Sequence, residues 1–417
     1  MTTDSTPGKT NLYSRYRGLS LGVKILLWMG IGIGVGILFG DDAEVVQPIG
    51  DLFIRLLFMS AIPLVFLNLI AGVTSIADFT TLGRLGFKTL LYYFATTSIA
   101  LCVGLLIASI IQPGIGMQLN EPVSMSFGTV PAISELILGL FPSNIFDAFS
   151  QGNIVQVVIF ALFLGVTILL LPAQQKEKIQ DAFALLASLF RELVGLILRF
   201  APIGVGALAA ATVGTYGGAI FGPLAKFIVS IWSAQMIMVV AYMIVLATLT
   251  KRAPLTWLKQ TAPLYATTAA TCSSLASLVV AMEIAREKLR LRENIYSFTL
   301  PIGVQLNKDG TAIMLVTVLL FTAQATGIEF SIAEMVTIVF VGLILSESSG
   351  GIPEGGLIAA LVFVQSFNLP LEIAGIVAGI YRLVDMGSTT VNCMGDMTWT
   401  TILSDGEDKR IRQQAGS

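Results

Sequence analysis

Asn307, Lys308 and Asp309 interrupt an apolar stretch of the chain, between TLPIGVQL before them and GTAIMLVTVLLF after them. A lysine ammonium at the middle of a membrane costs about 2.5–3.5 kcal/mol on insertion scales, so it needs partners there. The motif lies about midway along its apolar run, which disfavours a lysine that reaches the membrane interface. Two interpretations remain open: Lys308 is a tethered counter-ion for nearby carboxylates, or its burial makes it a proton carrier.

A second polar group lies near the end of the apolar sequence, in YRLVDMGSTTVNCMGDMT. Its polar residues follow one another at spacings of four, three and four, which places them on one face of a helix. They are Asp385, Thr389, Asn392 and Asp396. Carboxylates inside a membrane are functional-site candidates, so the pattern predicts a polar helix face that lines a cavity.

Two further segments, at about 254–286 and 331–366, mix apolar residues with small and polar ones. Non-helical backbone at membrane depth persists only where it lines a cavity or is buried in protein. In the first segment, Ser273, Ser274 and the backbone amides near them could hold a small anionic group at the start of a helix. A packing seam of small residues is the alternative.

The second of these segments contains SESSGGIPEGG, residues 346–356, whose glycines predict a flexible tip suited to a gate. The predicted gate residues are Ser349, Gly350, Pro353, Glu354 and Gly355. Glu347 and Glu354 either contact a substrate or face the water outside the membrane, and the sequence leaves both interpretations open.

The composition indicates a polytopic membrane protein. Of the 417 residues 55% are hydrophobic and 12% are charged, whereas a soluble chain carries about 25% charged residues. Histidine is absent, which excludes Ser-His and Cys-His nucleophiles and the usual zinc sites, and the three cysteines lack metal-binding spacing. A net charge of −2 provides no basic surface for nucleic acid. We therefore expect a lipid-embedded protein that is not an enzyme and binds no nucleic acid.

The charge pattern predicts an all-α polytopic membrane protein with eight transmembrane helices and two opposed re-entrant helical hairpins. Lys and Arg residues flank 254–286 on the cytoplasmic side, so this segment enters and leaves the membrane by one face. The C-terminal tail with Asp408, Lys409 and Arg410 is placed on the same side, so 331–366 enters from the opposite face, as in transporters built from inverted repeats. Both termini are then cytoplasmic. The predicted spans are about 19–40, 46–76, 86–112, 131–172, 182–213, 218–250, 295–326 and 371–403.

Four motifs together resemble those of the glutamate transporter family, the dicarboxylate/amino acid:cation symporters, and suggest a divergent bacterial-type member. They are NKDGT, the serine-bearing first hairpin, the second hairpin with GIP, and DMGSTTVNCMGD, in the family's order. The resemblance implies a homotrimer in the inner (plasma) membrane, with a transport domain that moves like an elevator against a scaffold. The implied division is a cytoplasmic segment at 1–18, a mainly scaffold and trimerisation domain at 19–85 and 113–217, a mainly transport domain at 86–112 and 218–403, and a cytoplasmic tail at 404–417.

The same resemblance implies a substrate site and an ion site. The substrate site comprises Ser273, Ser274, Thr311, Glu347, Gly351, Asp385, Ser388, Thr389 and Asn392. The ion site comprises Tyr93, Thr96, Thr97, Asn307, Lys308, Asp309 and Asp396. In the family, the residue matching Asp385 is the partner of the substrate's amino group.

Three positions depart from the family's pattern. Lys308 replaces a methionine, Glu347 replaces an apolar residue, and Ser388 replaces the arginine that grips a substrate's side-chain carboxylate. The predicted function is therefore secondary transport of a small zwitterion, a neutral amino acid or an amino sulfonate such as taurine. Because Lys308 is expected beside Asp309 and Asp396, where relatives bind sodium, transport is predicted to be sodium-independent and to need no cofactor. The alternative is a sodium- or proton-coupled symporter of amino acids or dicarboxylates, with Na+ as the bound ion.

Overall fold

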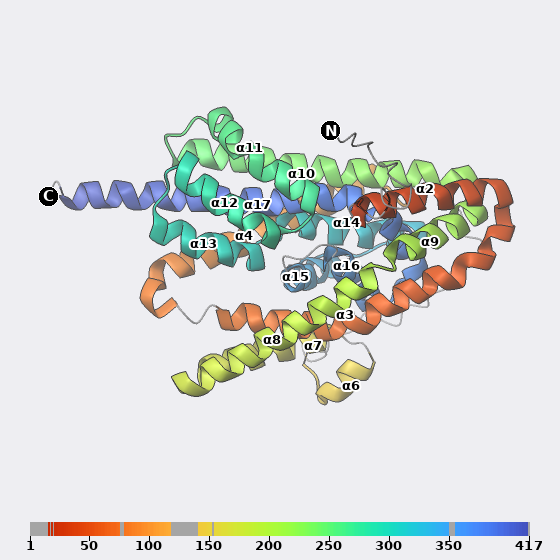
Figure 1. The fold of residues 1–417 in the computed structure, drawn as a ribbon, viewed down its shortest axis with the longest axis horizontal. Coiled ribbons are helices and arrows are strands. Elements are labelled where there is room, and N and C mark those ends of the chain that lie inside the picture. The colour runs from red at the N-terminus through yellow and green to blue at the C-terminus, as the bar shows by residue number, and fades with distance from the viewer. Residues whose placement is uncertain are drawn as a thin grey trace, which may run out of the picture.

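The protein is all-helical throughout the part of the chain that the computed structural model describes, namely residues 16, 18–19, 21–75, 79–117, 141–151, 154–349 and 355–415 (Figure 1). No strand occurs in these residues. This confirms the predicted all-α class. It also agrees with the requirement that backbone groups in lipid be satisfied within their own segment.

The first half of the described chain forms eight α-helices. They are α2 (Leu21–Phe39), α3 (Gln47–Ser75), α4 (Phe79–Ile111), α6 (Ile145–Ser150), α7 (Ile154–Leu169), α8 (Ala173–Leu198), α9 (Ala201–Tyr216) and α10 (Phe221–Leu249). Two short 3-10 helices, η1 (Gly40–Val46) and η3 (Gly217–Ile220), join α2 to α3 and α9 to α10.

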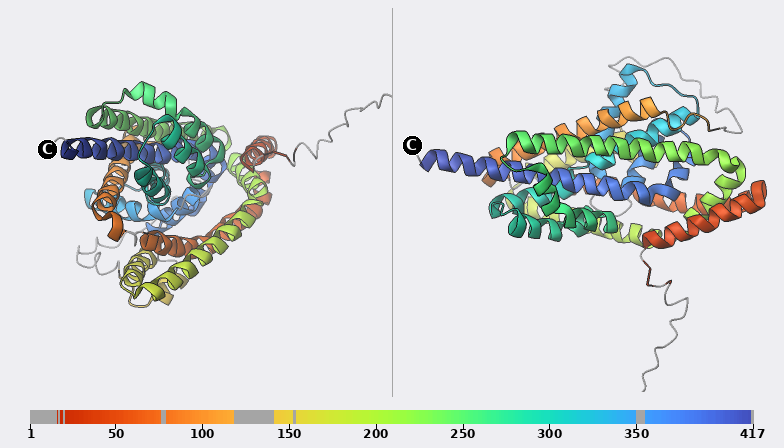
Figure 2. Two further views of the ribbon diagram at one scale, coloured as in Figure 1. Left: turned by 60° about the vertical axis from the view of Figure 1, so that its left-hand side comes forward. Right: turned by 90° about the horizontal axis from the view of Figure 1, so that it is seen from above.

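The second half contains seven more α-helices within the described residues. They are α11 (Pro254–Thr271), α12 (Ser274–Glu283), α13 (Glu293–Leu306), α14 (Asp309–Ala325), α15 (Ile332–Ser348), α16 (Gly355–Ser366) and α17 (Leu371–Ala415). A π-helical turn, Ile284–Lys288, follows α12. Helices α10 and α17 lie lengthwise side by side (Figures 1 and 2).

Several helices are apolar and long enough to cross a membrane. By length and composition alone, the described residues contain four such segments, or five if α8 and α9 together form one broken span. The sequence predicts eight, and the described parts of all eight predicted segments coincide with helices. Fewer segments than eight pass the test of length and composition. Helix α7 has only 16 residues, and α17 carries buried carboxylates and a polar end.

Two predicted spans, 182–213 and 295–326, are broken in the structure. The segment 182–213 was expected to be a single helix, but α8 and α9 meet at an angle of 53°. Pro202 stands in the first turn of α9, a position where its missing N–H is tolerated, whereas inside a continuous helix it would remove a hydrogen bond. A helix start at this proline therefore accounts for the bend.

The segment 254–286 forms a helix–turn–helix of two helices in contact, α11 and α12. Cys272 joins them in the left-handed conformation, with φ of 50°. Ser273 then caps α12, because its hydroxyl oxygen accepts a hydrogen bond from the Ala276 amide at 3.2 Å. Local capping chemistry thus explains why the chain reverses at this point.

The segment 331–366 forms the second pair of packed helices, α15 and α16. Ser331 and Glu334 make a capping box that starts α15. The predicted gate and substrate residues Gly350, Gly351, Pro353 and Glu354 lie outside the described residues.

Helix α14 occupies the centre of the described structure (Figure 1). Nearly all of its residues are buried, and it contacts α4, α10, α15, α16 and α17. The apolar run 293–325 is therefore not one continuous helix facing lipid. It breaks between Leu306 and Asp309, and the break lies inside protein.

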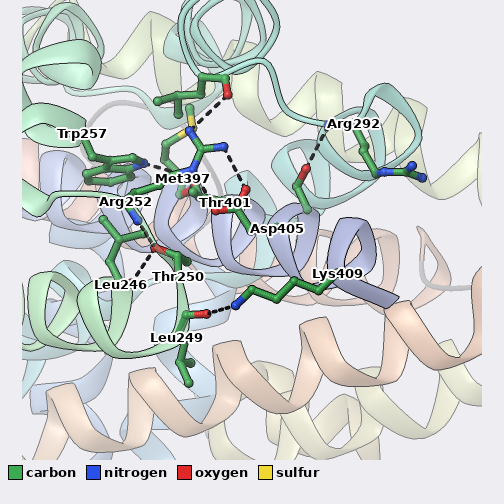
Figure 3. A network of polar contacts seen from close by, with 12 residues as sticks. Leu246, Leu249, Thr250, Arg252, Trp257, Arg292, Met397, Thr401, Asp405 and Lys409 are labelled. Carbon is green, nitrogen blue, oxygen red and sulfur yellow. Dashed lines mark hydrogen bonds and ion pairs between the residues drawn. The ribbon is translucent and has the colours of Figure 1, made fainter. Parts of the chain in front are cut away.

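The C-terminal part of α17 is bonded to two loops (Figure 3). Arg252 binds Asp405 through two contacts of 2.8 Å and donates to the Leu289 carbonyl at 3.2 Å. Ser404 accepts a bond from the Arg292 amide at 3.0 Å. The helix extends to Ala415, so residues 404–415 of the predicted cytoplasmic tail continue α17.

Candidate functional site

The centre of the site is the helix break at Asn307 and Lys308. Neither residue has helical backbone angles, and the Asn307 amide closes α13 on the Gly303 carbonyl at 2.8 Å. A helix that begins anew at Asp309 has amide groups without partners inside the helix. Asn392 of α17 satisfies two of them, since its side-chain oxygen accepts from the amides of Gly310 at 2.7 Å and Thr311 at 3.4 Å.

Four polar residues of α17, the set selected by spacing, are all buried: Asp385, Thr389, Asn392 and Asp396. The Thr389 hydroxyl donates to the Asp385 carboxylate at 3.2 Å. The Asn392 side-chain amide donates to the Thr311 hydroxyl at 3.1 Å, which links α17 to α14. The structure therefore forms two hydrogen-bonded pairs from the predicted substrate site, Thr389 with Asp385 within α17 and Asn392 with Thr311 between α17 and α14.

The predicted ion-site residues surround the same break. Asp309 accepts hydrogen bonds from Thr97 of α4, at 2.7 Å, and from Tyr242 of α10. Tyr93 donates instead to the Thr299 carbonyl at 3.1 Å, and Thr96 to the Tyr93 carbonyl at 3.2 Å. Helices α4 and α10 thus hold the Asp309 carboxylate by neutral hydroxyl groups.

Two buried oxygen atoms beside the break accept no hydrogen bond from any described residue. They are the side-chain carbonyl oxygen of Asn307 and one carboxylate oxygen of Asp396. The other end of the Asn307 side chain is fixed, because its amide donates to the Asn392 carbonyl at 3.0 Å. Buried acceptors are rarely left unsatisfied, so this pair fits a small cation such as Na+ that takes oxygen ligands.

A carboxylate-rich metal centre is a different kind of site. No group of three or more His, Cys, Asp or Glu side chains in the described part of the chain could hold a metal ion. A cation at the break would therefore depend on amide and backbone oxygens in addition to Asp396.

Lys308 has one of the two carboxylate neighbours that the sequence suggests. Its ammonium donates to the Val304 carbonyl, and the carboxylates that act on it electrostatically are Glu347, Asp396 and Asp385. Asp309 is bonded to Thr97 and Tyr242 and is not among these groups. The expected pairing of Lys308 with Asp309 is therefore corrected, since the Asp309 side chain points from α14 toward α4 and α10.

Glu347, near the end of α15, is 8% exposed and does not face open water. Neither of its carboxylate oxygens accepts a hydrogen bond from a described residue. The nearby Ser349, a predicted gate residue, is buried and donates to the Ser346 carbonyl at 2.8 Å, and Gly355 begins α16.

Ser388 has a neighbour that the sequence reasoning missed. The side-chain amide of Gln235, on α10, donates to the Ser388 hydroxyl at 3.0 Å, and that hydroxyl donates to the Val384 carbonyl at 3.1 Å. Gln235 is a lone amide in the apolar run SIWSAQMIMVV, which is a signal that could have identified it.

Ser273 and Ser274 of the first hairpin are buried beside α17. Ser273 uses its hydroxyl oxygen to cap α12, and Ser274 interacts with the thiol of Cys393. Arg382 fastens the same hairpin to α17, because its guanidinium donates to the Ala270 carbonyl at 2.8 Å.

The backbone leaves the helix at Asn307 and Lys308, and buried carboxylates enclose this break. In membrane proteins, broken helices of this kind form the solute sites of transporters. The class of protein is therefore a multi-pass membrane transporter. A family comparison identifies it more closely. The chain belongs to the sodium:dicarboxylate symporter family, whose model matches residues 21–405. This is a family of transport proteins.

Similar curated proteins span nearly the whole chain. The proton/glutamate-aspartate symporter of Escherichia coli (strain K12) is 27% identical over 95% of each chain. The proton/sodium-glutamate symport protein of Bacillus caldotenax is 29% identical over 94% of this chain and 95% of its own. The C4-dicarboxylate transport protein of Bacillus subtilis (strain 168) is 27% identical over 94% of each.

Proposed function

We propose that the protein is a secondary transporter of a small zwitterionic solute, either a neutral amino acid or an amino sulfonate such as taurine. The observation that carries this proposal is the environment of Ser388. Its hydroxyl is held by Gln235 and by the Val384 carbonyl, and none of these three groups is positively charged. A second carboxylate of a substrate would therefore lose a charge-assisted hydrogen bond, worth about 1.5–3 kcal/mol.

The rest of the site suits an amine and one acidic head group. Asp385 is buried on α17, accepts a hydrogen bond from Thr389, and is the proposed partner of the solute's ammonium group. The start of α12 offers backbone amides next to Ser273 and Ser274, which suits a carboxylate or a sulfonate. The two ends of a zwitterion then have separate partners on α17 and on the first hairpin.

Coupling to a cation is the candidate that the geometry favours. The described residues bury four carboxylates, Asp309, Glu347, Asp385 and Asp396, but only one ammonium, that of Lys308. An uncompensated buried charge is costly, so a cation or a proton has to accompany the solute. The unsatisfied oxygens of Asn307 and Asp396 support Na+ in particular. The relatives named above as proton or sodium symporters agree with this choice.

The sequence predicts sodium-independent transport, which is the second candidate here. One observation favours it: the ammonium of Lys308 acts on Asp396 as well as on Glu347. A tethered cation at this place would neutralise Asp396 permanently. The carrier would then be a facilitator or an exchanger, because a fixed charge does not travel in from solution.

The assembly and the movement belong to the same proposal. The family resemblance supports a homotrimer in the plasma membrane with cytoplasmic termini. In it, a transport domain moves as an elevator against a scaffold.

The test is uptake into proteoliposomes that contain the purified protein. Radiolabelled alanine, serine, taurine, aspartate and succinate are supplied with sodium, without sodium, and with a pH gradient. We expect uptake of a neutral zwitterion that exceeds aspartate and succinate uptake by about tenfold or more. Submicromolar binding of aspartate would refute the substrate assignment. Full uptake without sodium or a pH gradient would favour the second candidate for coupling.

A further inference from the structure

Tyr242 of α10 is a buried tyrosine whose hydroxyl reaches the helix break. It stands seven residues after Gln235, so the two side chains share one face of α10. That face carries the Gln235 amide to Ser388 and the Tyr242 hydroxyl to the carboxylate of Asp309. Tyr242 therefore belongs to the immediate surroundings of the break.

Gly395 of α17 provides the space that the phenol occupies. A Cβ atom on Gly395 would lie 3.0 Å from the Tyr242 hydroxyl oxygen and 2.5 Å from the side-chain nitrogen of Asn307. The missing side chain lets Tyr242 pass α17 on its way to Asp309 of α14. Because α10 and α17 are packed together along this contact, the phenol cannot withdraw without separating the two helices.

The two carboxylates beside the break differ in the partners that the protein gives them. One oxygen of Asp309 accepts from Thr97 at 2.7 Å and the other from Tyr242. Asp309 is also the first residue of α14, where the helix dipole favours a negative charge. Asp396 lies within α17, and one of its oxygens has no donor among the described residues, like the side-chain oxygen of Asn307. The protein itself thus stabilises the charge of Asp309, whereas Asp396 needs a further partner.

We infer that Tyr242 closes Asp309 to cations and so restricts the break to a single cation position, at Asn307 and Asp396. A cation that bound Asp309 would have to displace the hydroxyl hydrogen of a tyrosine that packing holds in place. Tyr242 is a positioning residue in this scheme, since it acts on the ion through Asp309. The inference rests on the cation-coupled form of the proposed function and deepens it, because it fixes where the ion binds.

The experiment counts sodium ions bound to the purified full-length protein by equilibrium binding of radioactive Na+ at saturating concentration, without a solute. We expect about one ion per chain for the wild type and about two for Tyr242→Phe, which leaves a buried oxygen of Asp309 without its donor. The double variant Tyr242→Phe, Asp309→Asn should return to about one ion, because the additional ligand has lost its charge. Tyr92→Phe is the matched control and should bind as the wild type does, since the buried Tyr92 hydroxyl has no hydrogen-bond partner among the described residues.

A wild type that binds about two ions per chain would overturn the inference, as would a Tyr242→Phe protein that keeps the wild-type count. A merely structural hydroxyl would lower the unfolding midpoint of Tyr242→Phe and leave the count unchanged. If Tyr242→Phe does not fold, Thr97→Val frees the other oxygen of Asp309 and carries the same expectation.

The same measurement separates this inference from the proposed function. A wild type that binds no sodium would refute the cation-coupled form of the proposed function. Tyr242→Phe must then gain about one ion, and the absence of a gain would overturn the role of Tyr242 as well. Because no solute is present, an error in the proposed substrate leaves the result unaffected.

Discussion

At the scale of single residues, the site depends on close approach between α14 and α17. A Cβ atom on Gly310 would overlap the backbone of Ser388. Backbone atoms cannot move aside as the end of a long side chain can. The glycine in the NKDGT motif is therefore required for packing at the helix break, in addition to the polar residues on either side of it.

We expect Gly310→Ala to lower the free energy of unfolding by about 1–3 kcal/mol, because overpacking displaces backbone in a fully packed interior. Thermal unfolding of the purified protein measures the change. Gly34→Ala is the matched control, since a Cβ at this helical position meets nothing within 4 Å. The control should be neutral or stabilising by up to about 1 kcal/mol. Equal midpoints for the two variants would contradict the packing role.

Asp385→Asn should lower the uptake of any solute that carries an amine by about tenfold or more at limiting solute concentration. Replacing the carboxylate by an amide removes a charge-assisted bond of about 1.5–3 kcal/mol, which is a loss of about tenfold or more in affinity. Uptake into proteoliposomes measures the effect, and circular dichroism confirms that the variant is helical. Transport at the wild-type rate would show that the amine is held by another group.

Helical spacing could identify the polar face of α17, because position along a helix determines which residues share a face. It could not identify the partners of that face. Gln235 reaches Ser388 from α10, and Tyr242 of the same helix reaches Asp309, so both pairings depend on how distant helices pack. A single sequence contains no direct record of such packing.

At the scale of elements, α17 provides the polar face of the site, and its C-terminal part is hydrogen-bonded to two loops. Arg252 follows α10, Leu289 lies between α12 and α13, and Asp405 belongs to α17. One guanidinium group therefore joins three segments (Figure 3). The sequence showed only a basic loop and a tail with charges of both signs, since it does not indicate that α17 continues to Ala415.

We expect Arg252→Ala to lower the free energy of unfolding by about 1 kcal/mol, a value reduced for the partial exposure of the pair. Arg286→Ala is the control, because Arg286 pairs with its exposed sequence neighbour Glu287 and its removal should leave the unfolding midpoint unchanged. Hydrogen exchange of residues 289–293 provides a second measurement. We expect faster exchange in Arg252→Ala alone. Equal exchange in both variants would show that the bonds of Arg252 to Asp405 and Leu289 do not stabilise this loop.

At the scale of the whole molecule, the helical class was predictable from composition, because lipid leaves few ways to satisfy a backbone. The division into a scaffold and a transport domain is a prediction that contacts can test. Helices α2 and α9, from the proposed scaffold, touch α17, from the proposed transport domain. A Cβ atom on Gly379 of α17 would lie 3.5 Å from the Met29 sulfur atom of α2.

A disulfide across this contact should stop an elevator. We expect the Met29→Cys, Gly379→Cys double variant to lose about nine-tenths of its uptake under oxidation and to recover it with reductant, since the two domains can no longer slide. The matched control is Thr268→Cys, Thr390→Cys, whose native hydroxyl oxygens lie 2.9 Å apart on α11 and α17, both within the transport domain. Its uptake should survive oxidation, because nothing moves across that bond.

Wild-type protein is oxidised in parallel to account for Cys102, Cys272 and Cys393. Full uptake by the oxidised, cross-linked Met29→Cys, Gly379→Cys protein would mean that α2 and α17 travel together, and the proposed domain boundary would then be wrong.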